Sequence, residues 1–259
     1  MDKRKIGLFI ICIFPVFVLL IQIISIKYVL LMGILFLITI FIFPYYKNIL
    51  LVFCITLFGY ILWNYINNNL ISQYNISDYV SIILNRFGLI GYLIPFILWH
   101  FIQRPNNKII GLGDYKANIK FPFIWNGFNE IIWRFTLVFS TICLSIILII
   151  IFTKQIKYDI IIYGIIFSII NAIIEEYIWR GLILSRIIDI SNEIFGLIIT
   201  SIAFGLYHYS LNFPIWVCIL FSIGGFYMGG AAIKSKGLVS PIIMHIMVNL
   251  IFVSIGIIF

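Results

Sequence analysis

Ionisable and amide side chains in the second half of the chain interrupt sequence that is otherwise apolar, where such groups are costly. They are Glu175, Glu176, Arg180, His208, His245 and Asn249. A carboxylate and an imidazole together can polarise a water for attack on a carbonyl carbon. A second imidazole and an amide can donate hydrogen bonds to the oxyanion that forms. These side chains are therefore sufficient for hydrolysis of an amide bond, without a serine or cysteine nucleophile.

The spacing of the first cluster separates its two carboxylates. On a helix, Glu176 and Arg180 are four residues apart and can pair on one face. Glu175 is rotated by about 100° from its neighbour and can point elsewhere. We interpret Glu176 and Arg180 as a buried ion pair that supports the structure. Glu175 has no partner nearby in the sequence, and an adjacent pair of carboxylates suits a general base or acid.

Helix geometry predicts that His208 lies at the depth of Glu175. A helix that continues from Glu175 to about Ile188 is roughly 20 Å long at about 1.5 Å per residue. Residues 189–192 then read as a turn, in which Asn192 can cap the next helix. From Glu193 to His208 the distance is again roughly 22 Å. An antiparallel helical hairpin therefore brings the imidazole back to the carboxylate.

A third element carries the remaining two candidates. His245 lies about 13 Å along a helix from Lys236, which again places it inside the apolar layer. Asn249 follows four residues later and shares its face. Three separate helices are therefore expected to bring Glu175, His208, His245 and Asn249 to similar depths.

Composition predicts the solvent in which these helices fold. Of 259 residues, 63% are hydrophobic and 10% are charged, a balance that is not typical of soluble domains. The apolar runs repeatedly reach the roughly 18–20 residues that cross a bilayer. We therefore predict an all-α polytopic bundle of about eight or nine transmembrane spans in the cell membrane, in contact with lipid. The spans are expected at about 6–26, 28–46, 49–66, 82–102, 130–152, 158–188, 193–210, 213–233 and 237–259.

The basic residues predict the orientation of the chain. The net charge of +8 comes from Lys and Arg residues that lie between apolar runs, so we exclude a nucleic-acid partner. Lys3, Arg4 and Lys5 predict a cytoplasmic N-terminus, because cytoplasmic connectors carry the excess of positive charge. The connector 67–81 has no Lys or Arg and is expected outside. The connector 103–121 is expected inside, and its basic residues are Arg104, Lys108, Lys116 and Lys120.

The long basic connector is also the one plausible boundary within the chain. We predict N-terminal transmembrane spans with this loop over residues 1–123, and a catalytic core over 124–259. Ionisable residues at depth gather in the second part. The first part contains little polar sequence.

Three motifs carry a family resemblance: Glu175-Glu176-x-x-x-Arg180, Phe204-x-x-x-His208 and His245-x-x-x-Asn249. In this order they resemble the CAAX prenyl protease and bacteriocin-processing family, also called type II CAAX endopeptidases. The resemblance covers about residues 125–259. One such motif alone is weak, but three in order on separate predicted membrane helices are specific.

The resemblance implies a glutamic intramembrane protease. It makes Glu175 the carboxylate that activates water and His208 its partner, while His245 and Asn249 stabilise the oxyanion. Glu176 and Arg180 become supporting residues, and Phe204 shapes the site. The implied substrate is a membrane-associated peptide or protein, either lipidated, as in eukaryotic members, or a bacteriocin or pheromone precursor.

Other readings of the same residues stay open. Glu175, His208 and His245 could together hold a catalytic zinc, but the sequence lacks the His-Glu-x-x-His motif, so we expect no metal and no cofactor. Gly111-Leu112-Gly113-Asp114 formally matches a motif of aspartyl intramembrane proteases, and we interpret it as a turn. A transporter is disfavoured because no repeated halves are present. An immunity or scaffold protein that binds a peptide without cutting it remains an alternative.

Overall fold

The computed structural model describes residues 3–74, 77–103, 109–154 and 156–258. Two of the basic residues used to predict the orientation, Arg104 and Lys108, lie outside these ranges.

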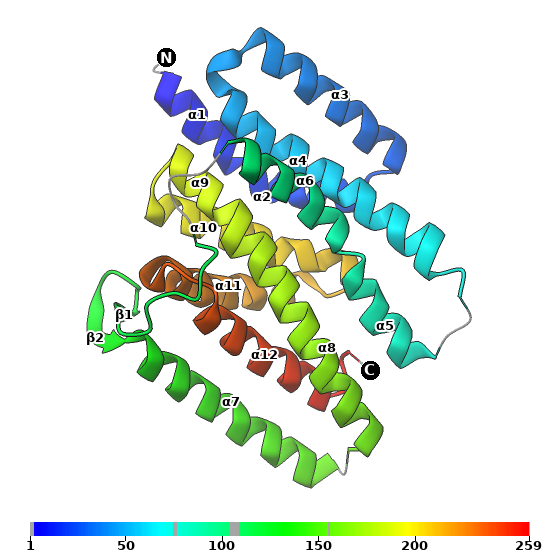
Figure 1. The fold of residues 1–259 in the computed structure, drawn as a ribbon, viewed down its shortest axis with the longest axis vertical. Coiled ribbons are helices and arrows are strands. Elements are labelled where there is room, and N and C mark those ends of the chain that lie inside the picture. Colours follow the sequence, from blue (N-terminus) through cyan, green and yellow to red (C-terminus); the bar gives the residue numbers. More distant parts are fainter. Residues whose placement is uncertain (1–2, 75–76, 104–108, 155, 259) are drawn as a thin grey trace.

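Helices form nearly all of the described chain (Figure 1). In the first half they are α1 (Lys3–Cys12), α2 (Phe14–Ile23), α3 (Ile26–Ile42), η1 (Pro44–Tyr46), α4 (Lys47–Tyr65), η2 (Ile66–Ile71), α5 (Asp78–Phe87) and α6 (Ile90–Ile102). In the second half they are α7 (Ile132–Lys154), α8 (Tyr158–Glu176), η3 (Tyr177–Leu184), α9 (Ser185–Ile190), α10 (Glu193–Tyr207), η4 (His208–Leu211), α11 (Ile215–Ser235) and α12 (Val239–Ser254).

Joined end to end, these elements confirm the predicted all-α membrane bundle. Within the described ranges, seven continuous helical segments are long and apolar enough to cross a membrane. Two shorter apolar helices, Ile26–Ile42 and Val239–Ser254, correspond to predicted spans at 28–46 and 237–259. Each predicted span overlaps one helical segment, and the differences are confined to the ends, where capping and turns set the boundary rather than hydropathy.

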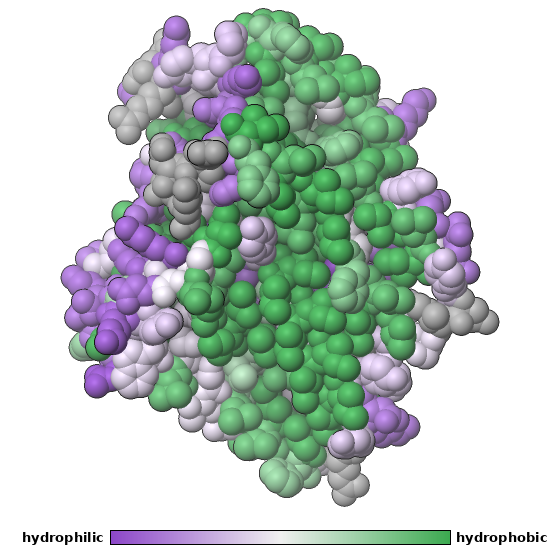
Figure 2. All heavy atoms as spheres, viewed as in Figure 1, coloured by the Kyte–Doolittle hydropathy of each residue, from purple (hydrophilic) through white to green (hydrophobic). Residues whose placement is uncertain are grey.

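Apolar side chains cover the outside of the bundle as well as its core. Figure 2 shows a wide hydrophobic band across the molecule, with hydrophilic residues gathered at its two edges. Helix α7 illustrates the pattern, since Leu137, Val138 and Ile149 are all more than half exposed. A surface of this kind is suited to lipid rather than to water, because every backbone polar group of a helix is satisfied within the helix.

The two hydrophilic edges are opposite ends of the bundle. One edge, which we call the basic face, holds the chain start, the β-hairpin and the α11–α12 connection (Figure 1). There Lys3 lies over the ring of Tyr45, and Lys234 lies over the ring of Trp125. The other edge, the opposite face, holds the connectors after η2, α7 and η4 and the end of α12. There Lys154 donates a hydrogen bond to the carbonyl of Ile255.

A small antiparallel hairpin on the basic face was not predicted. Strands β1 (Asn118–Pro122) and β2 (Gly127–Ile131) pair with Asn118 opposite Ile131 and Pro122 opposite Gly127. Residues 123–126 connect the two strands, and β2 begins at Gly127, which has a positive φ angle. The predicted boundary between residues 1–123 and 124–259 falls inside this hairpin. The division of the chain there stays a prediction.

Helix α10 packs closely against its neighbours, which fixes the position of His208 at its end. A Cβ atom on Gly205 would collide with Ser222 Oγ and with the Cys218 carbonyl oxygen. Only glycine allows α10 and α11 to approach this closely, as small residues do in membrane bundles. Helix α2 packs on another side of α10, so the first span also supports the second half.

Candidate active site

Glu175 and Glu176 form the end of α8, immediately before a widened helical turn. The sequence predicted α-helix throughout 158–188, but Tyr177–Leu184 is π-helical. At its end, the Ser185 hydroxyl donates to the carbonyl of Arg180, five residues back. Short π-helical segments are rare and often lie at functional sites.

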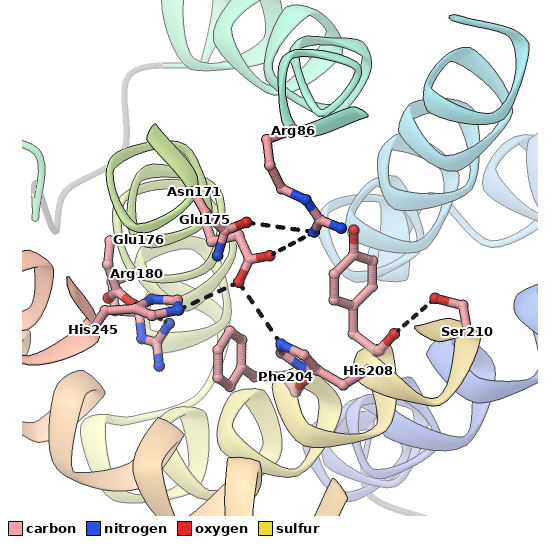
Figure 3. A network of polar contacts seen from close by, with 10 residues as sticks. Arg86, Asn171, Glu175, Glu176, Arg180, Phe204, His208, Ser210 and His245 are labelled. Atoms are coloured by element: carbon pink, nitrogen blue, oxygen red, sulfur yellow. Dashed lines mark hydrogen bonds and ion pairs between the residues drawn. The ribbon is translucent and has the colours of Figure 1, made fainter. Parts of the chain in front are cut away.

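Glu175 lies at the centre of the predicted residues (Figure 3). Its Oε2 atom is 3.9 Å from Nε2 of His208 and 3.7 Å from Nε2 of His245. The residue is only 1% exposed. The structure thus brings together the three ionisable side chains that helix geometry placed at one depth.

Each histidine ring is oriented by its other nitrogen. Nδ1 of His208 donates a hydrogen bond to the Phe204 carbonyl at 2.8 Å, because a carbonyl only accepts. Nδ1 of His245 donates to Oε1 of Glu176 at 2.7 Å. With both Nδ1 atoms protonated, the Nε2 atom of each neutral ring carries a lone pair. Both Nε2 atoms face Glu175, so both are placed to accept or return a proton there.

Glu176 has a different environment from Glu175. Its Oε1 atom accepts from Nη1 of Arg180 at 2.7 Å as well as from His245. Nη2 of Arg180 donates to the Gly225 carbonyl at 3.4 Å, and the guanidinium lies 4.3 Å from the ring centre of Phe204. The ion pair expected from the spacing is therefore present, and it also holds His245 in place.

Aromatic rings enclose the two histidines. The ring of Phe204 lies edge-on to His208 at 4.8 Å and to His245 at 5.9 Å between centroids. On its other side, His208 stacks on Phe221, with centroids 4.0 Å apart and planes 14° apart. These rings leave the imidazoles little freedom to rotate and place apolar surface around the charged groups.

Glu175 borders a cavity of about 200 Å³ that is large enough to receive part of a peptide. Its polar lining residues are Arg86, Asn171, Glu175, His208 and Asn249, and its apolar ones are Ile82, Phe167, Leu211, Phe213, Phe221, Phe252, Ile257 and Ile258. Nδ2 of Asn249 is buried and has no hydrogen-bond partner in the described part of the chain. A free amide donor beside the cavity is what an oxyanion site requires.

Two residues beside Glu175 were not predicted to contact it. Nη1 of Arg86, on α5, is 3.7 Å from Oε1 of Glu175 and 3.4 Å from Oδ1 of Asn171. The sequence contained an indication of each contact. Arg86 lies within a predicted span, where a charge needs a partner, and Asn171 lies four residues before Glu175 on the same helical face.

With Arg86 included, the formal charges around Glu175 and Glu176 balance. Two carboxylates, Glu175 and Glu176, face two guanidinium groups, Arg86 and Arg180. A balanced set lowers the cost of burying each charge, which is otherwise on the order of several kcal/mol for an unpaired ion. The charge of Glu175 is thus supported by a helix from the first half of the chain.

The first span also contacts the histidine end of α10. The backbone N–H of Ser210 donates to Oε1 of Gln22 at 2.9 Å. Nε2 of Gln22 donates to the Leu206 carbonyl at 3.2 Å. Gln22 therefore bonds to backbone groups on both sides of His208, where α10 ends.

Replacing Arg86 by Met is expected to reduce the hydrolytic rate by about 10- to 100-fold, the size of effect seen when a partner that orients a reactive group is lost. Glu175 would lose its nearby positive charge and Asn171 a donor. Replacing Arg86 by Lys keeps the charge and should retain more activity. The measurement is kcat and KM of both variants, and equal losses for Met and Lys would contradict a role for this charge.

The structure also describes the residues of the alternative zinc site and of the Gly-x-Gly-Asp sequence. In the part of the chain that the structure describes, no group of three or more His, Cys, Asp or Glu side chains has the arrangement of a metal site. The expectation of no metal nevertheless stays a prediction. Asp114 is exposed and accepts a hydrogen bond from the backbone of Lys116, while its own N–H donates to the Ser235 carbonyl. The Gly-x-Gly-Asp sequence itself is irregular, with Gly111 bridged to Gly237, and the turn begins just after Asp114, at Tyr115.

A comparison with known protein families gives a match in the region that contains these site residues. Residues 157–251 match the family described as type II CAAX prenyl endopeptidase Rce1-like. This stretch is Rce1-like. It contains all three motifs and confirms the resemblance drawn from them. Neither the curated proteins nor the solved structures gave a significant match.

The apolar helices, together with the match to a membrane-protease family, support a multi-pass membrane protein. At the level of the family, they support a CAAX-type endopeptidase that acts on a peptide or protein in the membrane. The matched stretch is less than half of the chain. Arg86 and Gln22, which contact the site from the first half, lie outside it.

Proposed function

We propose that the chain is an intramembrane endopeptidase that hydrolyses a peptide bond with a water activated by Glu175. One observation carries the proposal. The buried Glu175 carboxylate faces Nε2 of two oriented histidines, beside a cavity that is also lined by Asn249, whose Nδ2 has no hydrogen-bond partner among the described residues. The Rce1-like match supports the same reaction class.

The first step uses the gap between Glu175 and His208. Their atoms are 3.9 Å apart, which is too far for a direct hydrogen bond but suits one water that bonds to both at about 2.8 Å. Such a water donates one O–H to Oε2 of Glu175 and the other to Nε2 of His208. Its lone pair is then free to attack the carbonyl carbon of the substrate, and its proton passes to Glu175.

The second step needs donors for the developing oxyanion and a proton for the leaving group. Asn249 donates from Nδ2. His245 donates from Nε2 in its doubly protonated form, because its other proton, on Nδ1, is bound to Glu176. As the tetrahedral intermediate collapses, the C–N bond breaks and Glu175 returns its proton to the leaving amine. Water is consumed, and a carboxylic acid and an amine are released.

The proposed substrate is a membrane-associated or lipidated peptide or protein segment. Phenylalanines and isoleucines form most of the cavity wall, so apolar side chains beside the scissile bond would be bound there. A bacteriocin or pheromone precursor has this character.

The test is cleavage by the purified full chain in lipid nanodiscs. Candidate membrane peptides are incubated with the wild-type chain, and new termini are identified by mass spectrometry. Hydrolysis by a water predicts that no covalent peptide–enzyme adduct accumulates and that added hydroxylamine forms no hydroxamate product. A hydroxamate would indicate an acyl-enzyme and overturn the proposed step.

Removal of metal ions separates this mechanism from a zinc peptidase. We expect activity to be unchanged after incubation with a chelator, because the proposed steps use only side chains of the protein. Loss of activity that zinc restores would instead favour a zinc held by Glu175, His208 and His245. Activity after chelation is compared with a known zinc peptidase as the positive control.

A further inference from the structure

The cavity beside Glu175 is lined by residues from the opposite face of the bundle. Leu211 and Phe213 come from the turn between α10 and α11, and Ile257 and Ile258 follow α12. Ile82 lies in the first turns of α5, just after the connector from η2. Figure 1 places this connector and the chain end C together, away from the hairpin.

On the basic face, close packing covers the end of α11 and the start of α12. The N–H of Leu238 donates to the Gly111 carbonyl, and Gly113 packs against Gly237 so closely that a Cβ on Gly113 would lie 2.9 Å from the Cα of Gly237. Ile124 of the hairpin is 1% exposed and packs against Gly230. The ends of α11 and α12 on this side are therefore covered by the segment 109–114 and the hairpin.

Lysines distinguish the two faces. Among the described residues, those on elements that end at the basic face are Lys3, Lys5, Lys47, Lys116, Lys120, Lys234 and Lys236. Those on elements that end at the opposite face are Lys27, Lys154 and Lys157. Because an excess of Lys and Arg in short connectors marks the cytoplasmic side, the basic face is cytoplasmic.

We infer that the active-site cavity opens to the extracytoplasmic side, and that the substrate is a peptide or protein segment that has already crossed the membrane. This inference rests on the proposed function, because it assigns the direction from which that same site is filled. A pocket on the basic face, beside Gly111 and Lys236, is lined by neither Glu175 nor His208, so a substrate that remains in the cytoplasm would not meet the carboxylate there. A segment of an exported peptide would meet the cavity between η4 and α12 directly.

Cysteine accessibility tests the direction without requiring activity. The four native cysteines are replaced by Ser, and single cysteines are introduced by L211C at the cavity rim and K120C on the hairpin. A second pair, Y74C on the opposite face and Y115C on the basic face, uses two exposed positions that do not line the cavity. Each variant is labelled in intact cells, and again after permeabilisation, with a maleimide that does not cross membranes.

The expected result is labelling of L211C and Y74C in intact cells, and of K120C and Y115C only after permeabilisation. The reverse pattern would overturn the orientation. Labelling of Y74C but not of L211C in intact cells would overturn the opening of the cavity. The same pattern is expected in a Glu175→Gln background, so a protein without peptidase activity would still report the direction, and the two proposals fail separately.

Discussion

Replacing Glu175 by Gln is expected to reduce peptide hydrolysis by about 10³- to 10⁴-fold, at the upper end of the effect of removing a general base. Glutamine has nearly the same shape and can remain between His208 and His245. Its amide has no negative charge and cannot take a proton from water. The rate of product formation in nanodiscs, at saturating peptide, measures the loss.

The matched control is Glu130→Gln on the hairpin. Glu130 is a half-exposed carboxylate that pairs with Arg134 at 3.8 Å, and it lies on the basic face, away from the cavity. This variant should retain the wild-type rate. A Glu175→Gln variant that kept most of its activity would refute the role of this carboxylate.

The same substitution distinguishes a peptidase from a scaffold. If the protein protects or signals by holding a peptide, its biological effect should survive Glu175→Gln, because the side chain keeps its size. If the effect depends on cleavage, it should disappear together with hydrolysis. The complete set of motifs shows a capacity for chemistry, and this comparison determines whether the capacity is used.

Much of the fold was predictable because lipid imposes strong constraints. Long apolar runs must form helices, so each predicted span overlaps a helical segment. The hairpin and the helix ends depend on local turn chemistry, to which hydropathy is insensitive. Asn192 is an exception, since its side chain accepts a hydrogen bond from the Phe195 N–H and caps α10 where the sequence predicted.

For the active site, helix geometry brought the predicted histidines and Glu175 together. It could not identify the contacts between the two halves of the chain. Arg86 is 89 residues before Glu175, and only the packing of α5 against α8 shows that they meet. Nor could spacing show that His245 contacts both carboxylates, because the ring orientation depends on the hydrogen bond to Glu176 and on packing against Phe204.

Replacing Arg180 by Met is expected to destabilise the protein by about 3–5 kcal/mol, the usual cost of removing one partner of a buried ion pair. Glu176 is 0% exposed and Arg180 is 3% exposed, so neither has water to replace the lost partner. Oε1 of Glu176 would keep its hydrogen bond from His245 but would lose the positive charge beside it. The free energy of unfolding in detergent, from denaturant titration, measures the change.

A matched control with the same spacing is available on the surface. Arg134→Met removes the partner of Glu130, also four residues away, but these side chains are 57% and 40% exposed. Water replaces the lost contact there, so the expected cost is about 0–1 kcal/mol. Equal losses for the two variants would contradict a buried structural pair.

The double variant Glu176→Gln with Arg180→Met separates the two roles of this pair. If the loss in Arg180→Met comes from an uncompensated buried carboxylate, then neutralising that carboxylate should recover part of the stability. Activity should not recover, because a neutral amide at position 176 cannot hold His245 as an ionised carboxylate does. If the double variant regains stability but not activity, the Glu176–Arg180 pair has two separate roles. It balances a buried charge, and it orients the imidazole that faces Glu175.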